Sequence, residues 1–408
     1  MKLVMLTSNY PYGNDGDNVF VKNEMPSLSE RFNSISILAT CDGKTNNCAF
    51  DNVTSFSINI RSFSLISFIL AFFGTIKGFF TTFFETCGYC KKISKIKILK
   101  EIFKYEYAYQ RMKKQLFKEL YNCNVVYSFW MSSRLYAAIK VCRKKHLKCR
   151  IITRAHGYDL YCHRGPLPFR NYIGNNVDEI IFISKNGMSY YKDTIFSNLK
   201  QECALSVYYL GIDKEPEFLN YLPSNTLKIV SCSSVIQLKR LDIIIDALSQ
   251  INDVEIEWTH FGGGDLFDSM KDYAFDKLSQ KKNINYMFSG QKTNKEIIDF
   301  YRENGADIFV NASDTEGIPV SIMEALSFGI PTICRNVGGN SEINLAGSSR
   351  YLLDKNADCK AFAEAFKDYY FLNPAQKNSL REDSLKVFDT LFSRKSINAF
   401  AEHISNPF

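Results

Sequence analysis

Residues 313–331 read SDTEGIPVSIMEALSFGIP and follow Ile308–Asn311, an apolar run typical of a buried strand. The stretch predicts a loop that contains Gly317 and then a helix that begins near Pro319. In an open parallel α/β sheet, ligands bind at the carboxyl ends of the strands, where N–H groups of the next helix meet phosphate groups. We therefore predict an α/β fold with an anion-binding loop at this position.

The same alternation of strand, loop and helix extends through the rest of the chain. A strand-like run at 2–7, a helical stretch to about residue 32 and a second run at 34–39 predict a βαβ unit. Further strand-like runs in the first half lie at 125–127, 150–153 and 179–184. After residue 225 the pattern restarts, with strand-like runs at 227–232, 255–261 and 308–311 and helical stretches at 241–251 and 266–278. Two Rossmann-like α/β domains are predicted.

The length of 408 residues is consistent with two domains. The charged, Pro-containing stretch 213–225 is the natural linker, which divides the chain into domains over 1–212 and 213–385. Residues 386–408 are expected to form a C-terminal helix that packs back on the first domain.

Composition narrows the class of protein. With 46% hydrophobic and 23% charged residues, the chain has the composition of a folded globular protein. The start, MKLVML, leads directly into a strand pattern without a secretory signal, so export is not expected. The twelve cysteines are scattered without zinc-ligand spacing, which favours reduced thiols and no metal site.

The net charge of +7 is concentrated in one segment of the chain. Residues 91–120 hold ten basic and three acidic residues, which equals the excess of the whole chain. This basic block follows an apolar one, because Ser62–Ile76 carries no charge and a further apolar run reaches Phe84. A basic block beside an apolar block favours an anionic membrane surface over nucleic acid.

The length of the apolar block alone does not decide whether it spans a membrane. However, residues before 50 and after 120 are both predicted to supply strands to one sheet, and a single crossing would separate them. We therefore expect residues 62–118 to associate with the membrane as an in-plane or re-entrant segment. Apolar residues at 93, 96, 99, 103 and 107, with lysines between them, suggest a basic amphipathic helix lying on lipid. The alternative is a core helix with a solvated lysine face.

Glu316 and Glu324 are eight positions apart, one in the loop and one on the helix. With this pair, the chain resembles the family-4 retaining glycosyltransferases (group 1) of the GT-B fold, whose signature is Glu-x7-Glu. Such enzymes act in bacterial polysaccharide, O-antigen and capsule biosynthesis. The resemblance continues through Asn336-Val337-Gly338-Gly339 and Val177–Ser184. It implies an acceptor-binding domain over 1–212 and a nucleotide-sugar-binding domain over 213–385, facing each other across a cleft.

The resemblance also assigns roles around the Glu pair. Glu316 would bind the donor sugar at the reacting centre, and Glu324 would bind the ribose hydroxyls. Backbone N–H groups at Ile318, Val320 and Ser321 would face the diphosphate, with Gly317 allowing close approach. If the two carboxylates have no such function, they are solvated residues of a helix.

A second cluster of candidate site residues lies at Ser231–Asp242, where the sequence again predicts a strand, a loop and a helix. The family places an Arg and a Lys here, five residues apart, to neutralise the leaving nucleoside diphosphate. Lys239 matches the Lys, whereas Ser234 occupies the Arg position. Arg240 would compensate only if the loop turns it inward, since a Lys-Arg pair at a helix start is ordinarily surface.

Three further residues are assigned by the resemblance. His156 follows the strand-like run 150–153 and is expected to contact the donor sugar. The alternative is a purely structural role for this histidine. Gly13 lies in the first loop, where a glycine lets the diphosphate and acceptor approach, and is otherwise a plain turn residue. Gly263 lies in a Gly-Gly-Gly-Asp loop near the expected nucleotide base.

The implied reaction transfers a sugar from a nucleoside diphosphate to an acceptor hydroxyl with retention at the anomeric carbon, without cofactor or metal. The membrane segment suggests a saccharide acceptor on a polyprenyl diphosphate and a protein peripherally bound at the cytoplasmic face of the bacterial cytoplasmic membrane. Two alternatives stay open: a sugar-nucleotide epimerase of the same fold, and a catalytically weak membrane-associated scaffold, which Ser234 favours.

Overall fold

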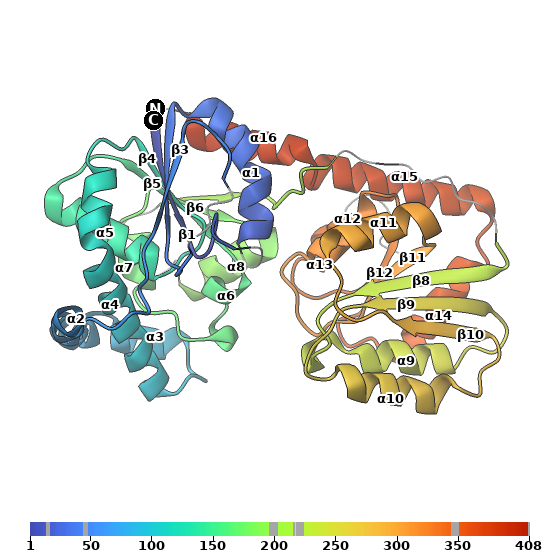
Figure 1. Cartoon of the computed structure of the whole chain (residues 1–408). Helices are drawn as coiled ribbons and strands as arrows, with labels where there is room; N and C mark the ends of the chain where they lie inside the picture. Colours follow the sequence, from blue (N-terminus) through green and yellow to red (C-terminus); the bar gives the residue numbers. More distant parts are fainter. Residues whose placement is uncertain are drawn as a thin grey trace. The chain divides into compact units, whose positions relative to one another are not determined.

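The computed structural model describes residues 1–13, 17–43, 48–195, 203–214, 217, 224–343 and 351–406. The chain divides into two compact units: unit 1 comprises Met1–Leu210 and Ser396–Phe408, and unit 2 comprises Gly211–Lys395. Each unit has a parallel sheet with helices on both faces (Figure 1). The predicted α/β class with two Rossmann-like domains is confirmed.

Unit 1 is built on a seven-stranded sheet in the order β3-β2-β1-β4-β5-β6-β7. Its strands are β1 (Lys2–Thr7), β2 (Ser34–Ala39), β3 (Val53–Ser57), β4 (Val125–Ser128), β5 (Arg150–Ala155), β6 (Glu179–Phe182) and β7 (Ala204–Val207). Every pairing is parallel, and β1 lies between β2 and β4, with Leu3 opposite Ile35 on one side and Val125 on the other. The order therefore reverses between β1 and β4, which makes this pair the topological switch point.

Helices cover both faces of this sheet. They are α1 (Asn18–Arg31), α2 (Leu65–Gly78), α3 (Phe84–Tyr89), α4 (Lys95–Leu120), α5 (Ser133–Lys145), α6 (Gly157–Leu160), α7 (Arg170–Gly174) and α8 (Lys185–Thr194), with a π-helical turn Phe79–Phe83 joining α2 to α3. The C-terminal region forms two helices, α15 (Pro374–Leu391) and α16 (Arg394–Ser405), and not one. Only residues from Ser396 onward belong to unit 1, where Phe400 contacts Tyr127 with ring centroids 5.3 Å apart.

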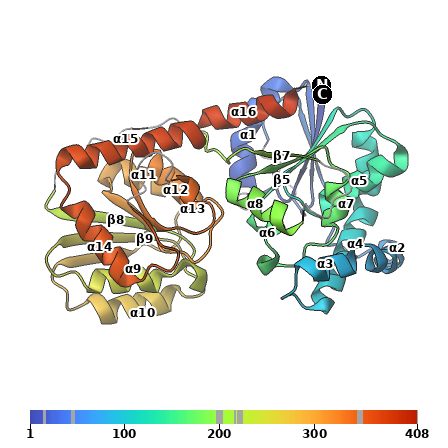
Figure 2. The ribbon, with the colours of Figure 1, turned by 180° about the vertical axis from the view of Figure 1, so that it is seen from behind.

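Unit 2 has a six-stranded parallel sheet in the order β10-β9-β8-β11-β12-β13 (Figure 2). The strands are β8 (Thr226–Cys232), β9 (Glu255–Phe261), β10 (Ile284–Phe288), β11 (Ile308–Asn311), β12 (Thr332–Arg335) and β13 (Leu352–Leu353). The helices are α9 (Leu241–Ser249), α10 (Phe267–Leu278), α11 (Asn294–Asn304), α12 (Val320–Leu326), α13 (Asn340–Ile343), α14 (Cys359–Tyr370) and α15. This is the 3-2-1-4-5-6 order of dinucleotide-binding folds, with its switch point between β8 and β11.

The packing of the basic block, residues 91–120, differs from what the sequence predicted. Helix α4 buries one stripe in the core of unit 1, which includes Ile98, Ile102, Met112 and Leu116. Its predicted lipid-facing residues are mostly half-buried, and Phe103 lies under Phe68 of α2, with ring centroids 5.1 Å apart. The prediction that α4 lies on lipid is therefore wrong, and the alternative holds: α4 is a core helix that packs against α5 and α2, with its lysine face exposed.

The exposed apolar surface lies instead on the helical run from α2 to α3. We call it the apolar ridge, and it consists of Phe63, Leu65, Ile66, Phe68, Ile69, Leu70, Phe72, Phe73, Ile76, Phe80 and Phe84. By length and composition, the run Leu65–Tyr89 is sufficient to cross a membrane, with a mean hydropathy of 1.6. However, β1 and β2 before it and β4 after it belong to one sheet, as predicted, and β3, which was not predicted, joins the same sheet. A single crossing would place strands of one sheet on opposite sides of the bilayer.

Candidate active site

A partly buried ion pair joins the two loops at the switch point of unit 2. Lys239 ends the 3-10 turn Gln237–Lys239 after β8, and Glu316 lies in the loop after β11. The Nζ atom of Lys239 lies 2.5 Å from Oε1 of Glu316, which also accepts a hydrogen bond of 3.1 Å from Nδ2 of Asn311. Glu316 is only 6% exposed. The two residues that the sequence assigned to catalysis in this domain are therefore in direct contact.

The loop after β12 packs against the backbone of Glu316 and Gly317. A Cβ atom at Gly338 would lie 1.8 Å from the carbonyl oxygen of Glu316, and one at Gly339 would lie 2.3 Å from that of Gly317. The backbone N–H of Gly339 donates to the Gly317 carbonyl at 2.8 Å. Gly338 also has φ +53°, so glycine is required there for both space and conformation. The two glycines therefore hold the Glu316 loop in place.

Helix α12 starts as predicted, with Pro319 as its N-cap residue. Val320 and Ser321 form the first helical positions, where backbone N–H groups have no acceptor within the helix. Ile318 is buried just before them. The structure thus provides N–H donors where the sequence predicted a diphosphate, and binding of that diphosphate stays a prediction.

Glu324 lies on the buried side of α12. It is 6% exposed, and Nδ2 of Asn294 on α11 donates to its Oε1. Burial raises the pKa of Glu324 from 4.5 to about 7, although the Asn294 hydrogen bond works against this shift. The sequence analysis missed Asn294, which is separated from Glu324 by 30 positions.

The loop after β8 lacks the second cation that the family places there. Ser234 is exposed. Arg240 adopts φ +51°, and its guanidinium pairs with Asp242 at 2.8 Å and with Asp314 at 3.3 Å. Asp314 also pairs with Arg335 at 2.6 Å. Arg240 would have to leave both carboxylates to reach a phosphate, so its predicted compensation for Ser234 is not favoured by this geometry.

Glycines hold the loops after β8 and β9 together. Gly262 has φ +141°, and a Cβ there would lie 1.9 Å from the Ser233 carbonyl oxygen. Gly264 has φ +153°, and its Cβ would lie 2.6 Å from the carbonyl oxygen of Val235. Gly263, the residue predicted to lie near the base, donates its N–H to Oε1 of Gln291 at 3.3 Å. The backbone thus requires glycine at the two neighbours of the predicted residue.

In unit 1, His156 follows β5, as predicted. Its imidazole is buried between Phe129 and Trp130, with ring centroids 4.7 and 4.4 Å away. Among the described residues, neither buried ring nitrogen has a hydrogen-bond partner, and Nδ1 lies 4.0 Å from Oδ2 of Asp159. Burial lowers the pKa of His156 well below 6.5, helped by Arg154. The imidazole is therefore neutral. Unpartnered buried nitrogens are uncommon and are compatible with a ligand-contacting role, which stays a prediction.

Asp159 positions the loops on either side of this histidine. Its carboxylate accepts N–H bonds from His156 at 2.6 Å and from Met131 at 2.7 Å. Burial raises the pKa of Asp159 to about 6. It thereby joins the loops that follow β5 and β4, a function that sequence spacing did not indicate.

The first loop of unit 1 has an anchor of its own. The carboxylate of Asp17 accepts backbone N–H bonds from Ser8, Asn9 and Tyr10. Gly13 follows in this loop, and its contact with a ligand stays a prediction. The sequence analysis did not single out Asp17.

Arg134 is a further residue that the sequence analysis missed. It lies at the start of α5, just after β4 at the switch point, and donates to Oγ of Ser8 at 2.7 Å and to Oγ1 of Thr40 at 2.8 Å. A search for cations after the carboxyl ends of strands would have found it. Among the residues that the structure describes, no group of three or more His, Cys, Asp or Glu side chains could hold a metal ion.

Comparison with known sequences agrees with this geometry. The family model described as "Glycosyl transferases group 1" matches residues 214–384. TuaC of Bacillus subtilis (strain 168), named for teichuronic acid biosynthesis, is 39% identical over 128 residues, or 31% of each chain. The O-antigen biosynthesis glycosyltransferase WclY of Escherichia coli is 24% identical over 216 residues, which cover 47% of this chain and 55% of WclY. These matches span about a third to a half of each relative.

Solved structures extend the similarity to both units. HepE of Anabaena, in complex with UDP, has a TM-score of 0.63 at 14% identity and covers 99% of this chain and 100% of its own. The lipopolysaccharide outer core galactosyltransferase WaaB has a TM-score of 0.62 at 14% identity, over 96% of this chain and 99% of its own. The protein therefore has the GT-B fold, and its residues 214–384 match the glycosyl transferases group 1 family.

Proposed function

We propose that this protein is a retaining glycosyltransferase that moves a sugar from a nucleoside diphosphate sugar to a saccharide acceptor in the synthesis of a bacterial cell-surface polysaccharide. The observation that carries the proposal is the ion pair between the half-buried Lys239 and the buried Glu316 at the switch point of unit 2, with Glu324 eight positions further on. The names of TuaC and WclY, which refer to polysaccharide biosynthesis, support the same class of pathway.

Each group in unit 2 is suited to one part of a nucleotide sugar. The first-turn N–H groups of α12 and the ammonium of Lys239 would stabilise negative charge that develops on the leaving diphosphate. Glu324, as a carboxylate, would accept hydrogen bonds from the ribose hydroxyls. In unit 1, the neutral imidazole of His156 would hydrogen-bond the transferred sugar. UDP-sugars are the first donors to test, because HepE was crystallised with UDP-glucose.

Retention at the anomeric carbon is proposed to follow a same-face route. In this route the leaving phosphate receives the proton of the acceptor hydroxyl, through an oxocarbenium-like transition state. A double displacement would need a free carboxylate nucleophile at the anomeric carbon. The ion pair with Lys239 and the hydrogen bond from Asn311, both at Oε1, make the Glu316 carboxylate a weaker nucleophile than a free one. This favours the same-face route, in which Glu316 only orients the sugar.

The acceptor and location are part of the proposal. Eleven large apolar side chains are exposed on the apolar ridge, more than a solvated surface would ordinarily carry. We infer that the ridge lies in the cytoplasmic face of the bacterial inner membrane and that the acceptor saccharide is carried on a polyprenyl diphosphate. If the helical run lies in the plane of the membrane, β3 and β4 remain on the same side of the bilayer, as their shared sheet requires.

A catalytically weak scaffold is the second candidate. Ser234 stands where the family has an arginine, and Arg240 is paired with Asp242 and Asp314, so one cation of the leaving-group clamp is missing. A sugar-nucleotide epimerase would bind the same donor, but it would have no use for the apolar ridge.

A thermal-shift screen against UDP, GDP, ADP, CMP and dTDP sugars tests the donor site. A ligand that binds only the folded state raises the melting temperature. We expect a selective rise with one nucleotide, reduced in a Glu324→Ala variant. Transfer of radiolabelled sugar to a membrane extract then separates the enzyme from the scaffold. A clear thermal shift without any transfer would favour the scaffold, and no shift with any donor would contradict the proposed donor site.

A further inference from the structure

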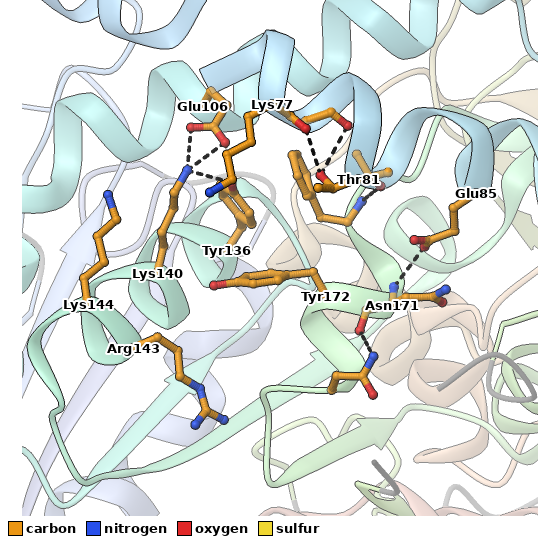
Figure 3. Close-up of a pocket in the computed structure, with 14 residues that line it drawn as sticks. Lys77, Thr81, Glu85, Glu106, Tyr136, Lys140, Arg143, Lys144, Asn171 and Tyr172 are labelled. Carbon is orange, nitrogen blue, oxygen red and sulfur yellow. Dashed lines mark hydrogen bonds and ion pairs between the residues drawn. The ribbon is translucent and has the colours of Figure 1, made fainter. Parts of the chain in front are cut away.

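Unit 1 contains a cavity of about 450 Å³ between the apolar helical run and α5. Its volume lies within the range of about 300–1,000 Å³ that is typical of small-molecule sites. Figure 3 shows Lys77 and Thr81 on one wall, Lys140, Arg143 and Lys144 to one side, and Glu85 with Asn171 to the other. None of these residues belongs to the loops at the carboxyl ends of the sheet, so the cavity is separate from the candidate active site of this unit.

The cavity has an excess of positive charge. Its four cations are Lys77, Lys140, Arg143 and Lys144, and its two carboxylates are Glu85 and Glu106. Glu106 is neutralised by Lys140, whose Nζ lies 2.6 Å from Oε2.

Three of the cations are not neutralised. Within the part of the chain that the structure describes, Lys77, Arg143 and Lys144 make no ion pair with a carboxylate, and all three are exposed. They are therefore available to an anion from solution.

The wall formed by Glu85 and Asn171 adds little negative charge. The carboxylate of Glu85 accepts a backbone N–H bond of 3.1 Å from Asn171, and burial raises the pKa of Glu85 to about 7. Near neutral pH this group is therefore partly protonated. Thr81, on the wall of Lys77, is exposed, and its hydroxyl donates to the carbonyl oxygens of Lys77 and Gly78.

The cavity adjoins the apolar ridge. Lys77 and Thr81 line the cavity, while Ile76 and Phe80 on the same helical turns are 46% and 74% exposed. A ligand whose phosphate lies in the cavity would therefore have an apolar surface beside it for a hydrocarbon chain. A free phosphate ion would use the cations only.

We propose that this cavity binds the phosphate groups of a membrane lipid whose hydrocarbon chain lies along the apolar ridge. Because such a lipid is the class to which the proposed acceptor belongs, the identification of this ligand with the acceptor rests on the proposed function. Recognition of the lipid phosphate itself does not.

Calorimetric titration of the full-length chain with farnesyl diphosphate and with inorganic pyrophosphate tests the proposal. The pocket variant is Lys77→Gln with Arg143→Gln and Lys144→Gln. The control variant carries the same charge change on the exposed face of α4, as Lys97→Gln with Lys100→Gln and Lys114→Gln. Melting temperatures of both variants verify that they fold.

We expect farnesyl diphosphate to bind at least about tenfold more tightly than pyrophosphate, and the pocket variant to lose at least about tenfold of that affinity. The control variant should stay within about twofold of the wild type. Equal losses in both variants would show diffuse attraction and overturn the site. Equal affinities for the two ligands would mean a site for free phosphate and would overturn the lipid assignment.

The same samples separate this proposal from the proposed function. A nucleotide-sugar thermal shift that persists in the pocket variant, while farnesyl diphosphate binding is lost, supports the cavity as a separate site. Farnesyl diphosphate binding that is sensitive to Glu324→Gln would place the ligand in the donor site and contradict the cavity. Absence of any nucleotide-sugar shift would count against the proposed function alone.

Discussion

The α-carbon of Gly338 faces the main chain of Glu316 so closely that a methyl group at position 338 would lie 1.8 Å from the carbonyl oxygen of Glu316. No rotation of a side chain can relieve this contact, because the carbonyl oxygen belongs to the backbone. The position of the Glu316 carboxylate thus depends on the absence of a side chain 22 positions later in the sequence.

Gly338→Ala should therefore lower nucleotide-sugar affinity by at least about tenfold and destabilise the protein by about 3 kcal/mol, from overpacking added to the positive φ. Gly305→Ala is the matched control, because Gly305 has φ +64° with open space around its α-carbon. Because Gly305 combines this φ with ψ −179°, a region essentially confined to glycine, the substitution should cost about 1–3 kcal/mol and leave binding unchanged. Chemical denaturation and donor titration measure both effects, and equal behaviour of the two variants would contradict the support assigned to Gly338.

Lys239→Met and Glu316→Gln should each lower kcat by about a hundredfold, because each removes one partner of the ion pair that orients the reacting groups. The double variant should lose less than the product of the two, since the residues are in contact. Lys292→Met, which removes an exposed cation paired with Glu296, is the control and should leave kcat unchanged. Independent effects in the double variant would show that the pair does not act as a unit.

Nucleotide-sugar affinity should depend on Glu324 and on pH. Ribose hydroxyls donate to a carboxylate, whereas burial raises the pKa of Glu324 to about 7. Affinity should therefore be constant above pH 8 and fall by up to about tenfold per unit as the pH decreases below 7. Glu324→Gln should bind weakly and without this pH dependence. A wild-type affinity that is flat from pH 5.5 to 8 would contradict a ribose contact by this carboxylate.

The same carboxyl group should reduce stability at alkaline pH. Between its ordinary pKa of 4.5 and its folded value of about 7, the folded state retains a proton that the unfolded state has released. The contribution of Glu324 to the free energy of unfolding therefore falls as the pH rises through this window. Glu324→Gln should be more stable than the wild type at pH 8 by about 1–3 kcal/mol and equal to it near pH 4.5. Urea denaturation at the two pH values measures the difference.

His156 should contribute the opposite dependence. Its folded pKa lies well below 6.5, so below pH 6.5 the unfolded state binds a proton that the folded state does not. Stability from this residue is present above pH 6.5 and is lost as the pH falls, by at most about 1.4 kcal/mol per unit. His156→Asn should show a smaller loss between pH 6.5 and 5 than the wild type. His146→Asn, at an exposed histidine, should not differ from it.

The apolar ridge should determine vesicle binding. Ile66→Ser with Phe73→Ser and Phe80→Ser should lower binding to phosphatidylglycerol vesicles at least about tenfold with little change in melting temperature, because these side chains are exposed. Phe275→Ser with Met287→Ser and Phe371→Ser removes exposed apolar residues from unit 2 and should leave binding unchanged. Equal vesicle binding by the ridge variant and the wild type would contradict membrane association through this surface.

Much of the fold could be predicted from residue patterns alone. The runs at 2–7, 34–39, 255–261 and 308–311 are strands with those bounds in the structure. Buried parallel strands are continuous apolar segments bounded by turn residues, so local composition is sufficient to locate them. The site residues that follow these strands were predictable for the same reason, since the carboxyl ends of parallel strands meet at one edge of the sheet.

The chemical state of those residues was decided by tertiary structure. Glu324 acquires a pKa of about 7 because residues distant in sequence bury it, and Arg240 is bound by Asp314 from another loop. The stripe of α4 that is buried depends on α2 and α5, which no periodicity within α4 specifies. Sequence by itself therefore determined the strands that precede the candidate site residues and the order of the chemical groups along the chain, whereas β3, β7, β10, β12 and β13 were not predicted. Tertiary structure alone decided which of these groups are paired, neutral or exposed, because solvation and charge pairing depend on neighbours that local sequence does not contain.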